Sequence, residues 1–218
     1  MLIIFDLDGT LLNTLEDLCD TGNYILRKHE HPIHPLEAYK QFVGNGMRKL
    51  IERALPEKFR KDDYIEQLFK EFLEYYEIHK TDKTHPYDGI VETLETLQAA
   101  GIQLAVASNK AHSAMAPLMA HYFPTVRFVA ALGNKPGAKP KPAPDIVLEI
   151  MKIAEETPAS TLYVGDSGVD MLTAQNAGLK KVGVLWGFRT RDELVQAGAD
   201  FLMRSPSAPE FLRFAQQL

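Results

Sequence analysis

The chain has 218 residues, of which 45% are hydrophobic, with a formal net charge of -5 at pH 7. This length is enough for a full α/β core and a small second unit. The acidic balance, with a pI near 5.8, argues against broad binding to nucleic acids or anionic membranes, because such binding needs a basic face. No apolar stretch approaches the length of a membrane span, and no signal peptide is visible. We therefore expect a soluble, cytoplasmic protein without nucleic-acid or membrane partners.

The first predicted strand ends at a pair of carboxylates. Residues 2–5 form a continuous apolar run, which is typical of a strand buried on both faces of a parallel sheet. Asp6 follows directly and Asp8 comes two positions later, so in an extended backbone both carboxylates point the same way. Two close anions raise each other's pKa unless a cation lies between them, and grouped oxygen ligands suit Mg²⁺. The alternative is a solvated turn at a strand end, since Asp and Gly are common turn residues.

The stretch from residue 14 to residue 83 indicates helices only. Thr14 is a plausible N-cap, and Asp17 follows three residues later, close to the pattern of a capping box. Apolar residues then recur at helical spacing up to residue 28, and further helices are predicted at 36–42, 47–55 and 62–79. We therefore expect an all-helical insert over residues 14–83.

Two features of this insert could suggest chemistry of their own. His29, His31 and His34 lie close together, but prolines between them disrupt any helical ligand pair and no cysteine joins them. A polar turn between helices is therefore the favoured interpretation. The one cysteine, Cys19, cannot form an internal disulfide, and its helical setting predicts core packing.

From residue 84 onward the pattern alternates between helices and strands. Strands are predicted at 102–107, 127–130, 161–164, 181–185 and 200–202, and helices at 90–100, 111–121, 144–154, 168–176, 191–197 and near 209–217. Such alternation means βαβ crossovers and an α/β fold with a doubly wound, Rossmann-like parallel sheet. Residues 1–13 and 84–218 should form this core domain, which the helical insert at 14–83 interrupts.

Polar side chains follow several of the predicted strands, where function gathers in such sheets. They are Asp6, Asp8 and Thr10 after the first strand, Ser108, Asn109 and Lys110 after the second, Asp166 and Asp170 after the fourth, and Lys141 in the long loop 133–142. Carboxylate pairs, a short hydroxyl and a lysine are the groups needed for Mg²⁺-assisted phosphoryl transfer through an aspartyl phosphate. Each residue alone could be a helix cap, a turn residue or a solvated charge. Their joint occurrence at successive strand ends favours the functional interpretation.

The expected mechanism follows from charge. A carboxylate that attacks a phosphate monoester dianion meets like-charge repulsion, which Mg²⁺ and a lysine would neutralise. The leaving alkoxide needs a proton and the intermediate needs an activated water, so a second carboxylate must shuttle protons.

Four segments in order resemble the four motifs of the haloacid dehalogenase-like hydrolase superfamily. They are residues 6–11, 106–110, 141–145 and 164–170. The resemblance implies that Asp6 is the nucleophile, that Asp8 is the general acid/base and that Lys141 clamps the charge of the nucleophile and the phosphoryl group. It implies phosphate binding by Ser108 and Asn109.

The same resemblance implies a metal site and a cap. Mg²⁺ would be held by Asp6, the backbone carbonyl of Asp8 and Asp166, with Asp170 in support directly or through Lys141 or water. The helical insert matches a C1-type cap, which in this superfamily closes over the site and excludes water.

Within the superfamily the chain most resembles the phosphoglycolate phosphatase group, on residues 42–55 and 183–188. Gly44, Asn45 and Gly46 at a helix start offer exposed N–H groups, and Arg48 one turn later can fork a carboxylate. The alternative is an ordinary Gly-rich helix start with a surface arginine. We expect these residues, together with Thr10, to bind a small phosphorylated metabolite, with 2-phosphoglycolate as the best candidate.

Other chemistries stay open. A phosphosugar mutase often carries an apolar residue where Thr10 stands, and a pyrophosphatase is a further alternative. Asp8 argues against a haloacid dehalogenase, and phosphonate hydrolysis would need a cap lysine, for which Lys49 is the candidate. From a different class, the chain could be a catalytically idle binding module. Both a monomer and a homodimer are compatible with the sequence.

Overall fold

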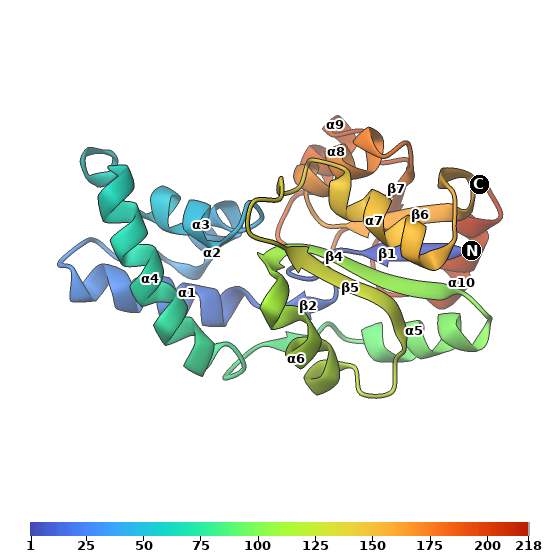
Figure 1. Ribbon diagram of the computed structural model, residues 1–218, viewed down its shortest axis with the longest axis horizontal. Helices are drawn as coiled ribbons and strands as arrows, with labels where there is room; N and C mark the ends of the chain where they lie inside the picture. The colour runs from blue at the N-terminus through green and yellow to red at the C-terminus, as the bar shows by residue number, and fades with distance from the viewer. Residues whose placement is uncertain (218) are drawn as a thin grey trace. The chain divides into compact units, whose positions relative to one another are not determined.

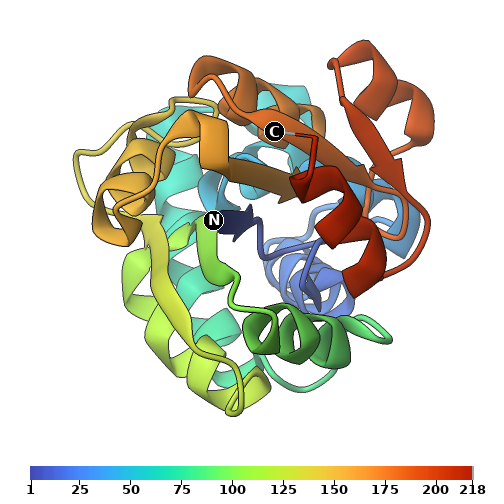
Figure 2. The same ribbon diagram turned by 90° about the vertical axis from the view of Figure 1, so that its right-hand side faces the viewer.

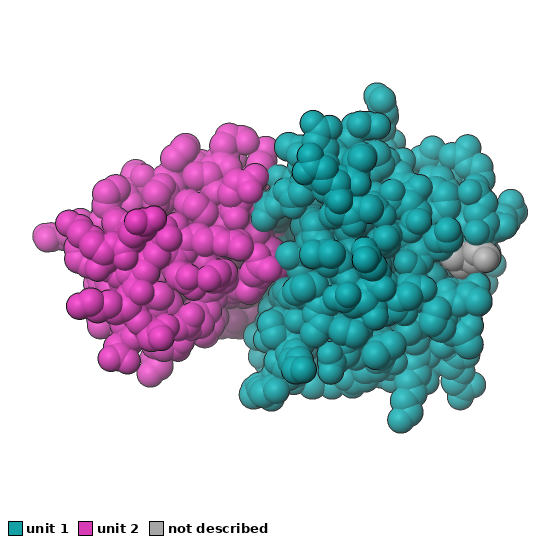
Figure 3. All heavy atoms as spheres, turned by 90° about the horizontal axis from the view of Figure 1, so that it is seen from above, with its two compact units in different colours: residues 1–12, 86–218 teal, residues 13–85 magenta. Residues whose placement is uncertain are grey.

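The computed structural model describes residues 1–217 and divides the chain into two compact units. The core unit comprises residues 1–12 and 86–218, and the helical unit comprises residues 13–85 (Figure 3). The short strands β2 (Leu12–Asn13) and β3 (His85–Pro86) pair with each other where the chain passes between the units. Within residues 1–217, no helix is both long enough and apolar enough to span a membrane.

The core unit is built on a six-stranded sheet with the strand order β5-β4-β1-β6-β7-β8. Its strands are β1 (Leu2–Phe5), β4 (Gln103–Ala111), β5 (Phe128–Asn134), β6 (Thr161–Gly165), β7 (Lys180–Val184) and β8 (Phe201–Met203). All of the strand pairs are parallel. The chain adds β4 and β5 on one side of β1 and then β6, β7 and β8 on the other. The carboxyl end of β1 therefore lies where the strand order reverses, which is where ligands bind in such sheets.

Helices cover both faces of this sheet, as Figures 1 and 2 show. One apolar cluster includes residues of α5 (Ile90–Ala99), α6 (His112–Tyr122) and α10 (Ala208–Ala215). The other includes residues of α7 (Asp145–Ala154) and α8 (Gly168–Asn176). The short helix α9 (Arg191–Gln196) follows β7. Ile3 and Phe5 belong to the first cluster, whereas Leu2 and Ile4 belong to the second. Because side chains alternate along a strand, β1 is buried on both faces. The predicted doubly wound α/β fold with an inserted helical domain is confirmed.

The strands β4 and β5 run further than the sequence predicts, since β5 continues to Asn134 instead of ending at residue 130. β4 continues to Ala111 instead of ending at residue 107, and its register against β5 shifts between Ala107 and Ala111. Ser108, Asn109 and Lys110 therefore lie in an irregular last part of the strand, and the long loop begins only after Asn134. The apolar pattern could not show this extension, because main-chain pairing at an irregularity does not require apolar side chains.

The helical unit contains α1 (Leu15–Lys28), α2 (Leu36–Phe42), α3 (Met47–Ala54), α4 (Asp62–His79) and a short 3₁₀ helix (Glu57–Phe59). Thr14 occupies the N-cap position of α1 as expected, but its side chain makes no capping hydrogen bond and no capping box forms. The buried carboxylate of Asp17 instead accepts hydrogen bonds from the backbone N–H groups of Lys83 and Thr84 at 3.0 and 2.8 Å. Asp17 thus bonds to a backbone group 66 residues away in the chain instead of to the N-cap residue Thr14.

The three histidines of the helical unit form a polar turn, as expected. The Nε2 atoms of His29, His31 and His34 lie 3.0 Å from Glu71 Oε2, 2.8 Å from the Tyr64 hydroxyl and 2.8 Å from the Ala54 carbonyl. Each ring therefore contacts a neighbouring element. Cys19 is buried, and burial raises the pKa of its thiol to about 11. The burial of Cys19 and the raised pKa of its thiol fit the predicted role in core packing.

Candidate active site

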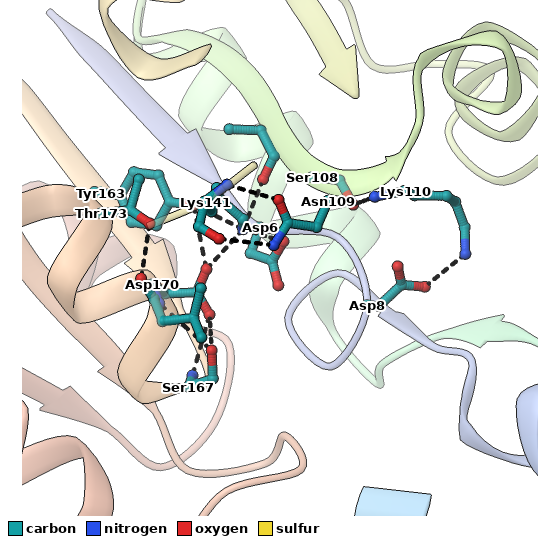
Figure 4. Close-up of polar contacts among 12 residues, drawn as sticks. Asp6, Asp8, Ser108, Asn109, Lys110, Lys141, Tyr163, Ser167, Asp170 and Thr173 are labelled. Carbon is teal, nitrogen blue, oxygen red and sulfur yellow. Dashed lines mark hydrogen bonds and ion pairs between the residues drawn. The ribbon is translucent and has the colours of Figure 1, made fainter. Parts of the chain in front are cut away.

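Lys141 lies at the centre of a buried polar cluster at the carboxyl end of β1 (Figure 4). It comes from the loop between β5 and α7, and its ammonium is 2.7 Å from Asp6 Oδ1 and 2.7 Å from Asp170 Oδ1. The carbonyl of Ala107 and the hydroxyl of Tyr163 each lie 3.0 Å from the same nitrogen. The lysine thus joins the end of β1 and residues within β4 and β6 to the start of α8.

Three buried carboxylates lie close together here, and two of them, Asp6 and Asp170, contact this lysine. Asp6, Asp166 and Asp170 each offer an oxygen, and these oxygens lie within 4.8 Å of one another. Burial and the charge of Asp170 raise the pKa of Asp6 to about 7, although Lys141 opposes the shift. Burial and the charges of Asp170 and Asp6 also raise the pKa of Asp166 well above its usual range. The cluster therefore carries more negative charge than one ammonium can neutralise, and its oxygen ligands fit a hard divalent cation such as Mg²⁺.

The two later carboxylates differ in how the protein holds them. Asp170 accepts from Lys141 and, at 3.2 Å, from Tyr163 through Oδ1. Its Oδ2 accepts from the backbone N–H and the hydroxyl of Ser167 at 3.1 and 2.6 Å, in a capping box at the start of α8. Both oxygens of Asp170 are thus engaged within the protein. Asp166 Oδ2 accepts from the backbone N–H of Phe188 at 2.7 Å.

Two glycines let the backbone approach Asp166 closely. Gly9 has a φ of +94°, and a Cβ added there would lie 2.4 Å from Asp166 Oδ2. A Cβ added at Gly187 would lie 2.3 Å from the Cβ of Asp166 and 2.4 Å from the carbonyl oxygen of Gly9. No larger residue fits at either position without displacement. The loop after β7 is therefore part of the site. From the sequence, residues 183–188 indicated only a resemblance to the phosphoglycolate phosphatase group and no role in the site.

Thr10 is fully buried beside this loop. Its carbonyl accepts a hydrogen bond from Trp186 Nε1 at 3.0 Å, and its hydroxyl has no hydrogen-bond partner among residues 1–217. The predicted role of Thr10 in substrate binding stays a prediction. Its backbone ties the turn after β1 to the loop after β7.

Asn109 braces Lys141 from β4. Its Oδ1 accepts from the backbone N–H of Lys141 at 2.8 Å, and its Nδ2 donates to the Lys141 carbonyl at 3.2 Å. The side-chain amide is engaged in this way, and phosphate binding by Asn109 stays a prediction. Ser108 is buried, and its hydroxyl accepts from the backbone N–H of Lys110 at 3.1 Å. This hydroxyl also holds the irregular end of β4.

Asp8 does not belong to the cluster around Lys141. Its carboxylate lies 3.1 Å from the ammonium of Lys110, a buried residue (Figure 4). The sequence places Lys110 after a predicted strand but assigns it no role. A lysine directly after a Ser-Asn pair at a strand end was the available signal.

In the helical unit, Arg48 is engaged by acidic side chains. Its guanidinium pairs with Glu66, with Asp62 at 2.9 Å and with Glu52 at 3.9 Å. A substrate carboxylate would have to compete with these three groups, so the expected role of Arg48 stays a prediction that the structure does not favour.

Arg53, which the sequence analysis did not single out, fastens the Gly-rich loop before α3. Its Nη1 donates to the carbonyls of Gln41 and Phe42 at 3.2 and 3.0 Å, and its Nη2 donates to Asn45 Oδ1 at 2.7 Å. Gly44 and Gly46 in this loop have φ values of 114° and 85°, which favour glycine.

Known proteins share both the sequence pattern and the fold. This chain belongs to the haloacid dehalogenase-like hydrolase family, whose sequence model matches residues 3–184. It is therefore a hydrolase by family, with its acidic cluster at the ends of β1 and β6.

Among similar proteins, a phosphoglycolate phosphatase of Mesorhizobium japonicum is 35% identical over 192 residues, which cover 87% of this chain and 85% of that protein. A phosphoglycolate phosphatase of Aquifex aeolicus is 31% identical over 205 residues, covering 94% and 92%. A crystal structure of a protein from Lactobacillus delbrueckii subsp. bulgaricus has a TM-score of 0.90 at 31% identity and covers 98% of this chain and 97% of that one.

Proposed function

We propose that this protein is a Mg²⁺-dependent phosphatase that hydrolyses a small phosphomonoester, with 2-phosphoglycolate as the best candidate, through a phosphoryl group carried on Asp6. The observation that carries the proposal is the buried cluster in which Lys141 lies 2.7 Å from Asp6 and the oxygens of Asp6, Asp166 and Asp170 lie within 4.8 Å of one another. The names of the similar proteins support the choice of substrate.

Asp6 is the nucleophile in this proposal. Its carboxylate attacks phosphorus, and the bond between phosphorus and the ester oxygen breaks. Lys141 holds Asp6 through Oδ1 and places a positive charge beside the phosphoryl oxygens. Asp8 gives a proton to the leaving oxygen and then takes one from the water that cleaves the aspartyl phosphate. Phosphate and the alcohol are released, and Asp6 is restored.

The metal would be held chiefly by Asp6 and Asp166, with the backbone carbonyl of Asp8. Asp170 is better suited to a supporting role, because Lys141, Tyr163 and Ser167 already engage its two oxygens. When bound, Mg²⁺ would neutralise charge between the nucleophile and the phosphoryl group. The helical unit corresponds to the cap of the family, and its Gly44–Gly46 loop is proposed to bind the end of the substrate away from phosphorus.

The test is phosphate release by the full chain from 2-phosphoglycolate, with Mg²⁺ or with EDTA. We expect turnover with Mg²⁺ only, and a protein mass increased by one phosphoryl group when the reaction is quenched in acid. A panel that adds pyrophosphate, hexose phosphates and nucleotides distinguishes the alternatives. Interconversion of hexose phosphates would favour a mutase, and no hydrolysis of any ester would favour a binding module. A location in the cytoplasm and a monomeric or homodimeric state stay predictions.

A further inference from the structure

The first two acidic residues pair with different lysines. Asp6 pairs with Lys141 at 2.7 Å, and Asp8 pairs with Lys110 at 3.1 Å. Figure 4 shows the Asp8 carboxylate turned toward Lys110 and away from the cluster around Lys141. The two pairs are built from different loops and strands, since Lys141 lies before α7 and Lys110 lies in β4.

The backbone around Lys110 is held tightly. Its N–H donates to the Ser108 hydroxyl at 3.1 Å. On the neighbouring strand, a Cβ added at Gly133 would lie only 2.4 Å from the carbonyl oxygen of Lys110, so β5 approaches β4 closely at this point. The irregular end of β4 therefore directs the lysine side chain from a fixed position.

The charge of Lys110 also requires a partner. Its side chain is 2% exposed, and a buried ammonium is costly unless it is paired and hydrogen-bonded. The Asp8 side chain, which is 16% exposed, supplies a carboxylate within hydrogen-bond distance. An aspartate side chain has three staggered χ1 positions. A fixed ammonium selects the one in which the carboxylate meets it.

We propose that Lys110 is a positioning residue that holds the Asp8 carboxylate in the orientation needed for proton transfer. This inference rests on the proposed function, because it concerns the acid/base step of that reaction. Proton transfer requires the carboxylate within hydrogen-bond reach of the ester oxygen and later of the attacking water. A small misplacement of such a group costs a large factor in rate. Lys110 acts through Asp8 and makes no bond to phosphorus.

The first test compares Lys110→Met with Lys110→Arg in the full chain with Mg²⁺. We expect Lys110→Met to lower kcat about tenfold or more while KM changes less than about threefold, because the lost interaction serves the reaction step. Lys110→Arg, which keeps the charge, should recover part of kcat. Lys180→Met is the matched control, since Lys180 is an exposed lysine at the start of β7, and its kcat should equal that of the wild type.

The second test asks whether Lys110 acts through Asp8. In an Asp8→Asn background, adding Lys110→Met should change the residual rate by less than about twofold, because the group that Lys110 positions is already gone. Independent effects that multiply would overturn the inference. So would a Lys110→Met variant whose main defect is a raised KM, since that would indicate direct substrate binding.

A third readout depends on the leaving group. The burst of p-nitrophenolate from p-nitrophenyl phosphate needs little protonation, so Lys110→Met should slow this burst much less than it slows release of an alkyl alcohol. Equal losses would indicate a general structural defect and would overturn the proposal. If Lys110→Met does not fold, as judged by thermal unfolding, Lys110→Gln takes its place.

The outcomes separate the two proposals. A wild type that hydrolyses a phosphate ester, together with a fully active Lys110→Met variant, refutes the role of Lys110 alone. A wild type that hydrolyses no ester refutes the proposed function, and the role of Lys110 falls with it.

Discussion

To act as the proposed nucleophile, Asp6 must be ionised, yet its surroundings oppose ionisation. Burial and the neighbouring Asp170 raise its pKa, and Lys141 only partly offsets them. Lys141 itself stays protonated, because the carboxylates of Asp170 and Asp6 outweigh the effect of burial and raise its pKa well above the usual range. The surroundings therefore favour the charged form of Lys141 but shift Asp6 toward its neutral form.

Replacing Asp6, the proposed nucleophile, separates its chemical role from its structural one. We expect Asp6→Asn to lower kcat by about a hundredfold or more, because an amide cannot form the phosphoryl intermediate. The melting temperature should stay close to that of the wild type, since Lys141 keeps its contacts with Asp170 and Ala107. Phosphate release and thermal unfolding check both expectations. More than about a hundredth of wild-type kcat would contradict the nucleophile assignment.

The close approach at Gly187 can be tested by adding one methyl group. In Gly187→Ala the new Cβ would meet the Cβ of Asp166 at 2.3 Å, so the loop must shift and weaken the bond from Phe188 N–H to Asp166. We expect weaker Mg²⁺ binding, a lower kcat and a stability loss of about 1–3 kcal/mol. Gly168→Ala is the control, because its Cβ would meet the flexible Glu193 side chain at 3.3 Å and the Cβ of Ala197 at an ordinary contact distance of 3.6 Å. Mg²⁺ titration followed by calorimetry distinguishes the two variants, and equal affinities would count against the role of the loop.

At the scale of elements, two irregular segments carry groups that regular structure would not present. The end of β4 departs from regular pairing with β5 and places Ser108, Asn109 and Lys110 at the edge of the sheet. In the helical unit, the loop between α2 and α3 is held by a guanidinium from α3 itself. In both segments, hydrogen bonds to one or two side chains hold the backbone where the regular pattern of a strand or helix is interrupted.

Arg53 is expected to matter for both stability and substrate binding. Arg53→Ala removes donors from the carbonyls at the end of α2, which should cost about 1–3 kcal/mol. If the Gly44–Gly46 loop binds the substrate, as proposed, KM should rise while kcat changes less. Lys49→Ala is the control, since Lys49 is a half-exposed residue of α3 that pairs with Glu52. Steady-state kinetics and denaturant unfolding separate the effects, and a stability loss without a change in KM would remove the loop from the substrate site.

At the scale of the molecule, the acidic cluster couples stability to pH and to metal. The ordinary pKa of Asp6 is 3.8 and its value in the folded protein is about 7, so the folded state binds more protons between these values. The free energy of unfolding of the metal-free protein should therefore fall as pH rises through this range, by at most about 1.4 kcal/mol per pH unit for this carboxyl. The raised pKa of Asp166 acts in the same direction.

Mg²⁺ should reverse this loss, because it binds the ionised carboxylates. We expect Mg²⁺ to stabilise the protein more at pH 8 than at pH 5, where protons compete for Asp6. Denaturant unfolding with Mg²⁺ or with EDTA across this range measures the effect, and Asp6→Asn should show a weaker pH dependence. A metal-free stability that rises from pH 5 to pH 8 would contradict the assignment of the pKa shift.

The amino-acid sequence by itself determined the parallel sheet, the inserted helices and the edge at which Asp6, Lys141, Asp166 and Asp170 meet. Apolar runs and turn residues act locally, and the carboxyl ends of parallel strands share one edge. Only the tertiary structure decided the partners of several other side chains. Trp186 donates a hydrogen bond to Thr10, which lies 176 positions away in the chain, and Lys110 pairs with Asp8, which lies 102 positions away. Asp17 accepts from the backbone of Lys83 instead of forming the expected capping box. Such contacts depend on which segments folding brings together, and local periodicity carries no information about them.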